Sequence, residues 1–237
     1  MSNSQTIEIQ STDGTGTFTA YVALPPSGKG PAVVICQEIF GVNAAMRALA
    51  DQFARDGYVA VVPDLFWRLE PDVELGYTPE DWERAMAFMQ NFDQDVGAQD
   101  IAATLQQVRA LPECAGHPQV GVVGYCLGGK MAYLAACRTD AAVSVGYYGV
   151  GISSALDELP QMHGRLVLHL AAQDEFSTPA EQQTLHAATA GNPQVTLYDY
   201  PGMHHAFARP RGDHYDAAAA TLAHQRTLEA LRQALGA

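Results

Sequence analysis

The chain has 237 residues, 48% of them hydrophobic, and a formal net charge of −13 at pH 7. So acidic a chain lacks the basic face that nucleic acids and anionic membranes attract, and no apolar run approaches the roughly 20 residues of a membrane span, so neither partner is expected. Four cysteines without a CxxC pair or metal-finger spacing, and an N-terminus without a visible secretory signal, predict a cytoplasmic protein. The chain is expected to form one α/β domain over residues 1–237.

Short β-rich and apolar runs alternate along the chain with segments of helical composition. Thr6–Gln10 and Thr17–Ala23 flank a turn and predict an N-terminal antiparallel hairpin. Six further strands are expected at Ala32–Cys36, Tyr58–Val62, Val120–Gly124, Ala142–Tyr147, Arg165–Leu170 and Gln194–Tyr200. The expected helices are 43–55, Pro79–Asn91, Val96–Leu111, Met131–Cys137, Pro179–Ala190 and Tyr215–Leu235. This order predicts an α/β fold with a mostly parallel sheet of about eight strands and helices on both faces.

A glycine-flanked cysteine stands between the strand at 120–124 and the helix that follows. Gly124-x-Cys126-x-Gly128 has the spacing of a nucleophile elbow, with Cys where Ser is more common. The two glycines let strand and helix approach closely, and the helix N-terminus favours a thiolate. On these residues alone, a catalytic Cys126 and a buried structural cysteine are equally good interpretations.

An acid and a histidine follow two later strands. Asp174 comes after 165–170 and His205 after 194–200, which gives the order nucleophile, acid, histidine of the α/β-hydrolase fold. Histidine can take the thiol proton, and the acid can orient its ring. Asp174 is preferred to Glu175 because it follows its strand more directly, whereas the choice between His204 and His205 needs the resemblance below. The other histidines are expected to be structural or exposed: His117, His163, His169, His186, His214 and His224.

The loop Gln37–Gly41 follows the third strand, a position that normally supplies an oxyanion donor. We therefore expect the backbone N–H groups of Leu127 and Ile39 to stabilise the developing oxyanion. Glu38 in the same loop is unusual in so apolar a neighbourhood. From the residues alone, a functional role is as good an interpretation as a structural one, in which Glu38 is a helix-entry residue or the partner of a basic side chain.

The elbow also matches most of a phosphate-binding P-loop. Gly124-x-x-x-x-Gly129-Lys130 lies between a strand and a helix, and the apolar run 59–63 ends in Asp64, where a magnesium-binding Asp is expected. Met131, however, stands in place of the Ser or Thr that the magnesium ion needs. The sequence therefore does not favour nucleotide binding.

From about Ile7 to Leu235 the chain resembles the dienelactone hydrolase family of α/β-hydrolases. The matching segments are Gln37-Glu38-Ile39-Phe40-Gly41, Gly124-Tyr125-Cys126-Leu127-Gly128-Gly129, Tyr147-Tyr148-Gly149-Val150-Gly151, Gln173-Asp174 and His205-Ala206-Phe207-Ala208-Arg209. The resemblance implies Cys126 as nucleophile, His205 as base and Asp174 as its orienting acid. It implies no cofactor and no metal.

The resemblance also assigns residues around this triad. It implies that Glu38 holds the resting thiol and helps to form the thiolate, and that Arg209 binds a substrate carboxylate, a role that suits a bidentate guanidinium. Tyr147 is a further expected substrate contact. Trp82 stands where the prototype of the family has a second carboxylate-binding Arg, and Arg84, two residues on, faces another side of its helix.

The implied function is hydrolysis of a small-molecule lactone or ester by a monomer. The resemblance implies opening of a dienelactone-type enol lactone to maleylacetate, in aromatic degradation, through a thioester acyl-enzyme. Trp82, Met86 and Met89 would make one pocket wall apolar, so a carboxylesterase or thioesterase acting on an apolar acyl or aryl ester is the alternative. The same three residues also fit an ordinary amphipathic helix. A ligand-binding or thiol-sensing protein without activity is a third hypothesis.

Overall fold

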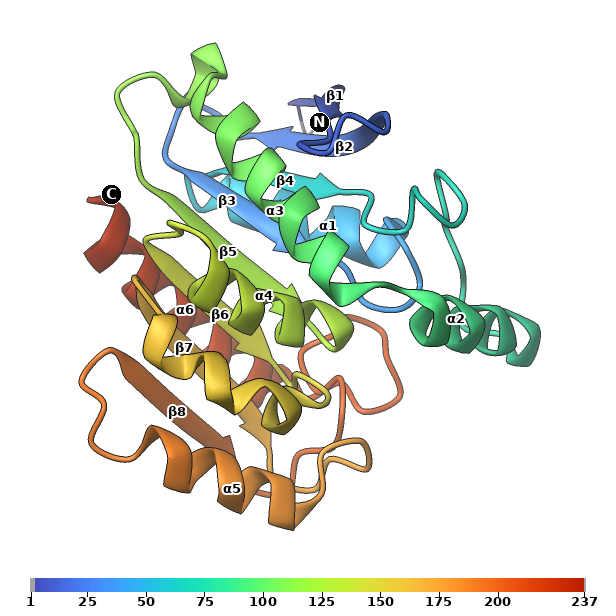
Figure 1. The fold of residues 1–237 in the computed structure, drawn as a ribbon, viewed down its shortest axis with the longest axis vertical. Coiled ribbons are helices and arrows are strands. Elements are labelled where there is room, and N and C mark those ends of the chain that lie inside the picture. The colour runs from blue at the N-terminus through green and yellow to red at the C-terminus, as the bar shows by residue number, and fades with distance from the viewer. Residues whose placement is uncertain (1–2, 237) are drawn as a thin grey trace. The chain divides into compact units, whose positions relative to one another are not determined.

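Two compact units make up the chain, residues 1–120 and residues 121–237 (Figure 1). The computed structural model describes residues 3–236. Within that range, no helix combines the length and the apolar character needed to cross a membrane. The single-domain organisation expected from the sequence stays a prediction.

The N-terminal unit contains four strands in the order β1-β2-β4-β3. β1 (Asn3–Gln10) and β2 (Thr17–Leu24) form the predicted antiparallel hairpin, and β2 also pairs antiparallel with β4 (Val59–Pro63). β4 and β3 (Ala32–Cys36) run parallel. Every residue of β3 and β4 is buried, as expected for apolar strands that are covered on both faces.

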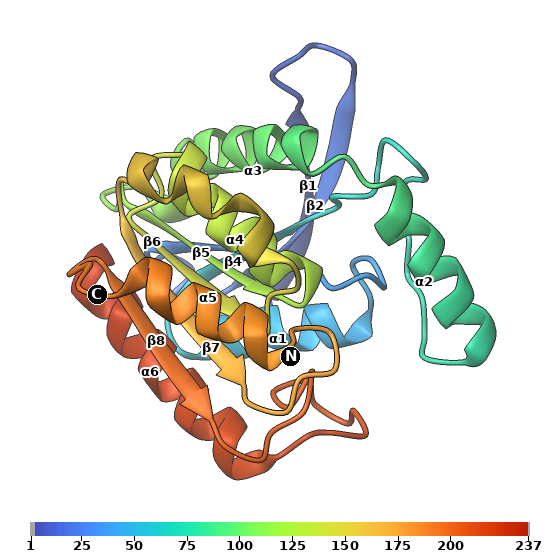
Figure 2. The same cartoon turned by 60° about the horizontal axis from the view of Figure 1, so that its bottom comes forward.

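Helices α1 (Ala44–Arg55) and α3 (Gln94–Arg109) cover opposite faces of these strands (Figures 1 and 2). Asn43 caps α1, because its side-chain oxygen accepts the N–H groups of Ala45 and Met46. α3 begins two residues before the predicted Val96, because the Asp93 side chain caps it. A short 3-10 turn, η1 (Pro112–Cys114), follows α3.

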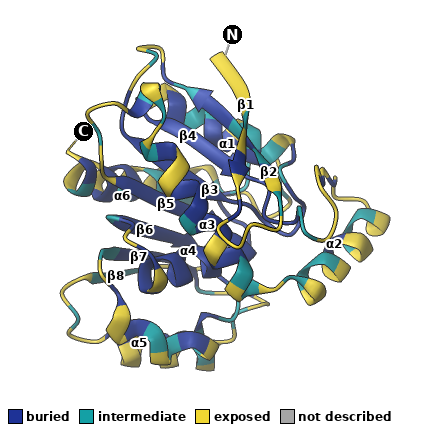
Figure 3. Ribbon diagram, turned by 45° about the horizontal axis from the view of Figure 1, so that its top comes forward, coloured by how far each residue is buried: buried dark blue, intermediate teal, exposed yellow. Residues whose placement is uncertain are grey.

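Helix α2 (Pro79–Asn91) is the least buried helix of this unit (Figure 3). Thr78 and Asp81 form a reciprocal capping box around Pro79 at its first turn. Ala85 is the only residue of α2 that is buried. The capping residues at its start, rather than packing against the core, therefore stabilise most of this helix.

The C-terminal unit has a fully parallel strand order, β5-β6-β7-β8. The bounds are β5 (Val120–Tyr125), β6 (Val143–Tyr147), β7 (Arg165–Ala171) and β8 (Val195–Tyr200). The connecting helices are α4 (Leu127–Arg138), η2 (Ile152–Gln161), α5 (Pro179–Thr189) and α6 (Ala217–Leu235). α4 and α6 lie on opposite faces of the strands (Figures 1 and 2). All eight expected strands are present, so the predicted α/β fold class is confirmed.

The predicted start of α4 at Met131 is wrong, because the helix begins at Leu127. Gly128 and Gly129 are poor helix formers, and for that reason the sequence favoured a later start. In the structure, eleven of the twelve residues of α4 are buried. Tertiary packing therefore overrides the low helix propensity of the two glycines.

A chain of buried hydrogen bonds ties α6 to β6, β7 and β8. The Tyr147 hydroxyl bonds to Thr227 Oγ1 at 2.6 Å, and the two ring nitrogens of His169 contact Thr227 Oγ1 at 3.0 Å and the Tyr200 hydroxyl at 2.8 Å. Burial, helped by the nearby Arg226, lowers the pKa of His169 to about 3. His169 is therefore neutral at physiological pH and satisfied in the core, the role expected for it.

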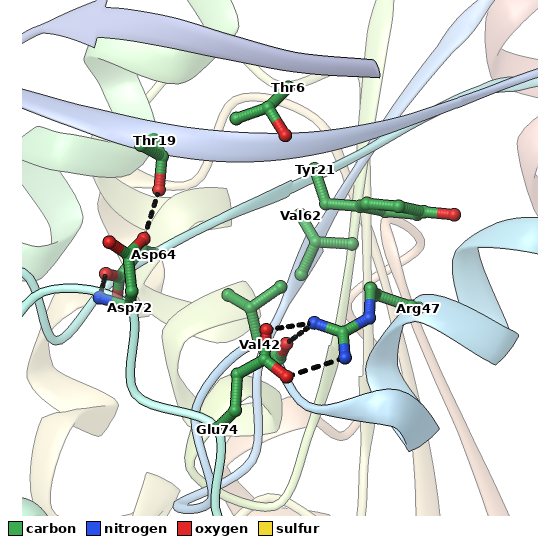
Figure 4. Close-up of a pocket in the computed structure, with 9 residues that line it drawn as sticks. All are labelled: Thr6, Thr19, Tyr21, Val42, Arg47, Val62, Asp64, Asp72 and Glu74. Carbon is green, nitrogen blue, oxygen red and sulfur yellow. Dashed lines mark hydrogen bonds and ion pairs between the residues drawn. The ribbon is translucent and has the colours of Figure 1, made fainter. Parts of the chain in front are cut away.

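A cavity of about 110 Å³ lies in the N-terminal unit (Figure 4). Its lining residues are Thr6, Thr19, Tyr21, Val42, Arg47, Val62, Asp64, Asp72 and Glu74. The Asp64 carboxylate accepts the backbone N–H groups of Phe66 and Asp72 at 3.0 and 2.8 Å. Asp64, the magnesium ligand of the P-loop alternative, is thus used to hold the backbone of its own loop.

Candidate active site

Cys126 lies alone between the end of β5 and the first residue of α4. Its φ of 56° and ψ of −117° are values that residues other than glycine rarely adopt. Its N–H donates to the Tyr147 carbonyl at 3.1 Å, and its carbonyl accepts the Gly129 N–H at 2.9 Å. These bonds fix the strained turn and place the sulfur at the N-terminus of a buried helix.

Close backbone contacts explain the glycines of the elbow. A Cβ on Gly124 would lie 1.8 Å from the carbonyl oxygen of Gly128, and a Cβ on Gly129 would lie 2.6 Å from that of Tyr147. Both obstacles are backbone atoms, which cannot rotate away as a flexible side chain could. Gly124 and Gly129 are therefore required by close contacts of the backbone around the elbow.

The loops after β7 and β8 bring Asp174 and His205 together. His205 Nδ1 lies 2.9 and 3.0 Å from the two carboxylate oxygens of Asp174, and both residues are buried. The Gln173 N–H donates to the Met203 carbonyl at 2.9 Å, which joins the two loops just before these side chains. Asp174 rather than Glu175, and His205 rather than His204, forms this buried contact.

His205 also contacts the thiol of Cys126. Burial lowers the pKa of His205, but hydrogen bonds to Asp174 and to Cys126, with the charges of these two groups, outweigh it and raise the pKa to about 10. The surroundings of His205 therefore stabilise its charged imidazolium form at neutral pH. The structure thus brings the three predicted triad residues into one hydrogen-bonded group.

Two aromatic rings that the sequence analysis did not single out pack on His205. Tyr148 and Phe176 lie edge-to-face with its imidazole, with ring centroids 5.0 and 4.9 Å apart. Phe176 is 46% exposed and stands two residues after Asp174, and an aromatic residue in so polar a loop is the signal that could have identified it. Tyr147, the residue expected to contact substrate, is 1% exposed and bonds to Thr227.

Leu127 and Arg209 are the other predicted site residues of this unit. Leu127 is the first residue of α4, and N–H groups in a first helical turn lack acceptors within the helix. Arg209 is half-buried and lies four residues after His205 in the same loop. The roles of Leu127 as oxyanion donor, and of Arg209 and Tyr147 as substrate contacts, stay predictions.

The remaining predicted residues lie in the N-terminal unit, around the loop after β3. Glu38 and Ile39 are both 3% exposed. Gly41 ends the loop with a φ of 76°, and a Cβ there would lie 1.8 Å from the Val73 carbonyl oxygen, so the backbone is fixed closely. Trp82 of α2 packs edge-on against Phe40, with ring centroids 5.0 Å apart. Trp82 therefore supports the loop that carries Glu38 and Ile39.

Metal-ligating side chains gather at one place among the described residues. Glu175, His204 and His214 are exposed and have ligand atoms within 4.8 Å of one another. All four cysteines are free and buried, and burial raises the pKa of the thiols of Cys36, Cys114 and Cys137 to about 12, 11 and 11.

Comparison with known proteins gives consistent matches over nearly the whole chain. A model of the dienelactone hydrolase family matches residues 18–235. A candidate carboxymethylenebutenolidase of Azospirillum brasilense is 41% identical over 229 residues, which cover 93% of this chain and 95% of that protein. Carboxymethylenebutenolidase 1 of Cupriavidus pinatubonensis is 38% identical over 226 residues, 95% of each chain. The crystal structure of a candidate dienelactone hydrolase from Klebsiella pneumoniae shares the fold, with a TM-score of 0.82, 23% identity and coverage of 97% of this chain and 99% of that chain.

Proposed function

Because the chain belongs to the dienelactone hydrolase family, a family of hydrolases, we propose that it opens a lactone or a small carboxylic ester with Cys126 as nucleophile. The observation that carries the proposal is the buried contact of His205 with Asp174 at 2.9 Å, together with the hydrogen bond from His205 to the Cys126 thiol. A nucleophile, a base and an orienting acid in mutual contact are what acyl transfer requires.

In the first half of the reaction, the Cys126 thiolate attacks the substrate carbonyl and a carbon–sulfur bond forms. Negative charge moves to the carbonyl oxygen, where the N–H of Leu127 and, by resemblance, that of Ile39 stabilise it. The ring carbon–oxygen bond then breaks as the carbonyl re-forms. The leaving oxygen takes the electron pair of this bond, and His205 gives it a proton, which leaves the imidazole neutral.

In the second half, neutral His205 takes a proton from water and the resulting hydroxide attacks the thioester. The carbon–sulfur bond breaks and its electron pair returns to Cys126 as the thiolate. Asp174 keeps the imidazole oriented through both proton transfers. All of these steps use side chains of this protein and water.

The relatives named carboxymethylenebutenolidase favour an enol lactone that bears a carboxylate, opened to maleylacetate. When an enol lactone opens, the leaving group is a stabilised enolate, so a thiol is a strong enough nucleophile for the reaction. Arg209 would bind the substrate carboxylate, and Glu38 would hold the resting thiol. Trp82, where the family prototype has an arginine, favours a less anionic acyl or aryl ester as the alternative substrate. The cytoplasmic location and the monomeric state stay predictions.

The experiment that tests the proposal compares turnover of an enol lactone by the wild type and by Cys126→Ala. We expect the variant to lose at least about 10⁴-fold in kcat, in line with loss of a nucleophile from a triad. Iodoacetamide should inactivate the wild type and add one carbamidomethyl group, located at Cys126 by mass spectrometry.

Cys137→Ala is the matched control, because Cys137 is also buried, lies near the far end of α4 and has a thiol whose pKa burial raises to about 11. It should keep both turnover and sensitivity to iodoacetamide. Full turnover by Cys126→Ala would contradict the proposal. Comparing p-nitrophenyl acetate with an anionic lactone separates the two substrate classes.

A further inference from the structure

Three side chains beside the proposed triad form a compact group on the surface. Glu175 is the chain neighbour of Asp174, His204 is the neighbour of His205, and His214 lies in the loop before α6. Nδ1 of His204 and Nδ1 of His214 lie 3.5 and 3.9 Å from the same oxygen of Glu175, and the two imidazole centroids are 5.0 Å apart. The proposed chemistry uses none of these three side chains.

The spacing of these atoms fits a tetrahedral ion. Zinc holds nitrogen and oxygen ligands at about 2.0–2.2 Å, so two ligands of a tetrahedral zinc lie about 3.3–3.5 Å apart. The distances from the Glu175 oxygen to the two nitrogens need to shorten by only a few tenths of an ångström, and the two nitrogens, with all ligand atoms within 4.8 Å of one another, must also draw together. All three side chains are nearly half exposed, so they can turn toward a common centre without disturbing the core.

The donor set selects the class of ion. Two imidazole nitrogens and one carboxylate oxygen suit Zn²⁺, Co²⁺, Ni²⁺ and Cu²⁺, whereas Mg²⁺ and Ca²⁺ prefer oxygen ligands alone. We propose that one transition-metal ion of the Zn²⁺ class binds to Glu175, His204 and His214, and that the bound ion lowers the rate of hydrolysis by changing the position of the His205 backbone. The second half of this statement rests on the proposed function, and the first does not.

Two of the three proposed ligands, Glu175 and His214, already form hydrogen bonds to the backbone of His205. Glu175 accepts the N–H of His205 at 3.2 Å, and Nδ1 of His214 donates to the carbonyl of His205 at 3.1 Å. A metal ion can bind this Nδ1 only when the ring proton has moved to Nε2 of the same imidazole, so the His205 carbonyl then loses its donor. Metal binding is thereby coupled to the position of His205, and we expect a fall in kcat with little change in KM.

The binding test uses the Cys126→Ser variant, without a histidine tag, so that the reactive thiol cannot bind the metal. Calorimetric titration with ZnCl₂ should give one ion per chain, and CoCl₂ should give the visible absorption of a tetrahedral cobalt site. His204→Ala and His214→Ala should each weaken binding at least tenfold, and MgCl₂ should give no heat of binding. Zinc affinity equal to the parent in both variants, or no binding at 1 mM zinc, would overturn the site.

His186→Ala is the matched control, because His186 is an exposed histidine that pairs with one carboxylate, Asp199, at 2.9 Å and has no second histidine beside it. This variant should keep the parent affinity for zinc. A loss as large as that of His204→Ala would show that zinc binds scattered surface histidines, and would contradict the proposal.

The activity test adds zinc to the wild type and to His204→Ala during turnover of the lactone. In the wild type we expect kcat to fall and to level off at a residual rate, over the same zinc concentrations as binding. In His204→Ala this fall should shift to at least tenfold higher zinc. Equal inhibition of both proteins would show that zinc acts on Cys126 directly, and would overturn the coupling. Because binding is measured in a variant that needs no turnover, failure of the metal site and failure of the hydrolase proposal are distinguishable.

Discussion

Helices α4 and α2 carry residues assigned to the same reaction, yet they are built in opposite ways. Eleven of the twelve residues of α4 are buried, whereas Ala85 is the only buried residue among the thirteen of α2. Cys126 stands at the start of α4, and Trp82 lies in the first turns of α2. The group proposed to do the chemistry is thus set in the core, and the residue expected to help select the substrate lies on a weakly buried helix.

The two helices also owe their stability to different interactions. α4 contains Gly128 and Gly129, which disfavour a helix, and is held by packing against its neighbours. α2 is held by the capping box of Thr78 and Asp81, and by an exposed ion pair between Arg84 and Glu70 that contributes little. We therefore expect substitutions near α4 to have large effects and substitutions in α2 to have small ones.

Asp174→Asn should have the largest effect of the variants considered below. The amide keeps the shape of Asp174 but loses the charge that helps to raise the pKa of His205, so this pKa should fall below about 10. By analogy with other triads, kcat should fall by about 10³–10⁴-fold. Steady-state kinetics and NMR titration of His205 measure the two effects.

Asp199→Asn is its control, because Asp199 forms an ion pair of the same type with His186 on the surface. It should leave kcat unchanged. If Asp174→Asn kept more than a tenth of the wild-type rate, Asp174 would not be the orienting acid.

Gly124→Ala tests the packing of the elbow itself. The added Cβ meets the Gly128 carbonyl oxygen at 1.8 Å, so β5 and α4 must move apart. We expect the free energy of unfolding, measured with urea, to fall by at least about 3 kcal/mol. Gly14 has a φ of 72° but nothing near its Cβ position, so Gly14→Ala should cost only about 1 kcal/mol, from the backbone conformation alone. Equal losses in the two variants would show that the elbow is loosely packed.

His169→Gln tests the buried hydrogen-bonded chain behind the strands. The pKa of His169 is about 3 in the folded protein and about 6.5 in the unfolded chain, so its stabilising contribution is complete above pH 6.5 and is lost as the pH falls from 6.5 toward 3. Between pH 7.5 and pH 5 the wild type should lose about 2 kcal/mol more stability than the variant. Urea unfolding at the two pH values measures this difference, and parallel losses would show that His169 is protonated in the folded state.

Trp82→Arg should have the smallest effect on the fold and tests the predicted selectivity of α2. Restoring the arginine of the family prototype should raise the ratio of kcat/KM for an anionic lactone over that for a neutral ester by about tenfold, the value of one charged hydrogen bond. The free energy of unfolding should change by less than about 1 kcal/mol. Ala87→Arg adds the same charge elsewhere on α2 and should leave the ratio unchanged. An unchanged ratio in Trp82→Arg would remove Trp82 from the substrate site.

Sequence alone predicted the parts of the site that follow from strand order. Cys126, Asp174 and His205 each follow a parallel strand, and the carboxyl ends of such strands meet at one edge of a sheet. The neighbours of His205 could not be predicted in this way. Tyr148 reaches the imidazole because its φ is 39°, a value that a sequence does not reveal for tyrosine.

The same limit applies to the group of Glu175, His204 and His214. In the sequence, Glu175 and His204 are the alternatives to Asp174 and His205, and His214 is expected to be structural or exposed. Their proximity depends on loop-to-loop hydrogen bonds such as the one from Gln173 to Met203 at 2.9 Å, and on the path of the chain from 206 to 216. Contacts between loops are set by three-dimensional packing, whereas periodicity and spacing report on single elements.

The sparse burial of α2 has a consequence for protein engineering. A library randomised at the exposed positions of α2, with Ala85 and the capping residues Pro79 and Asp81 kept, should consist mostly of folded proteins, and the proposed role of this helix predicts that it would sample new substrate preferences. A library of equal size in α4 would consist mainly of unfolded proteins, because nearly every position there is part of the core. Selection for new activities can therefore begin at exposed positions of α2, with Cys126 left unchanged.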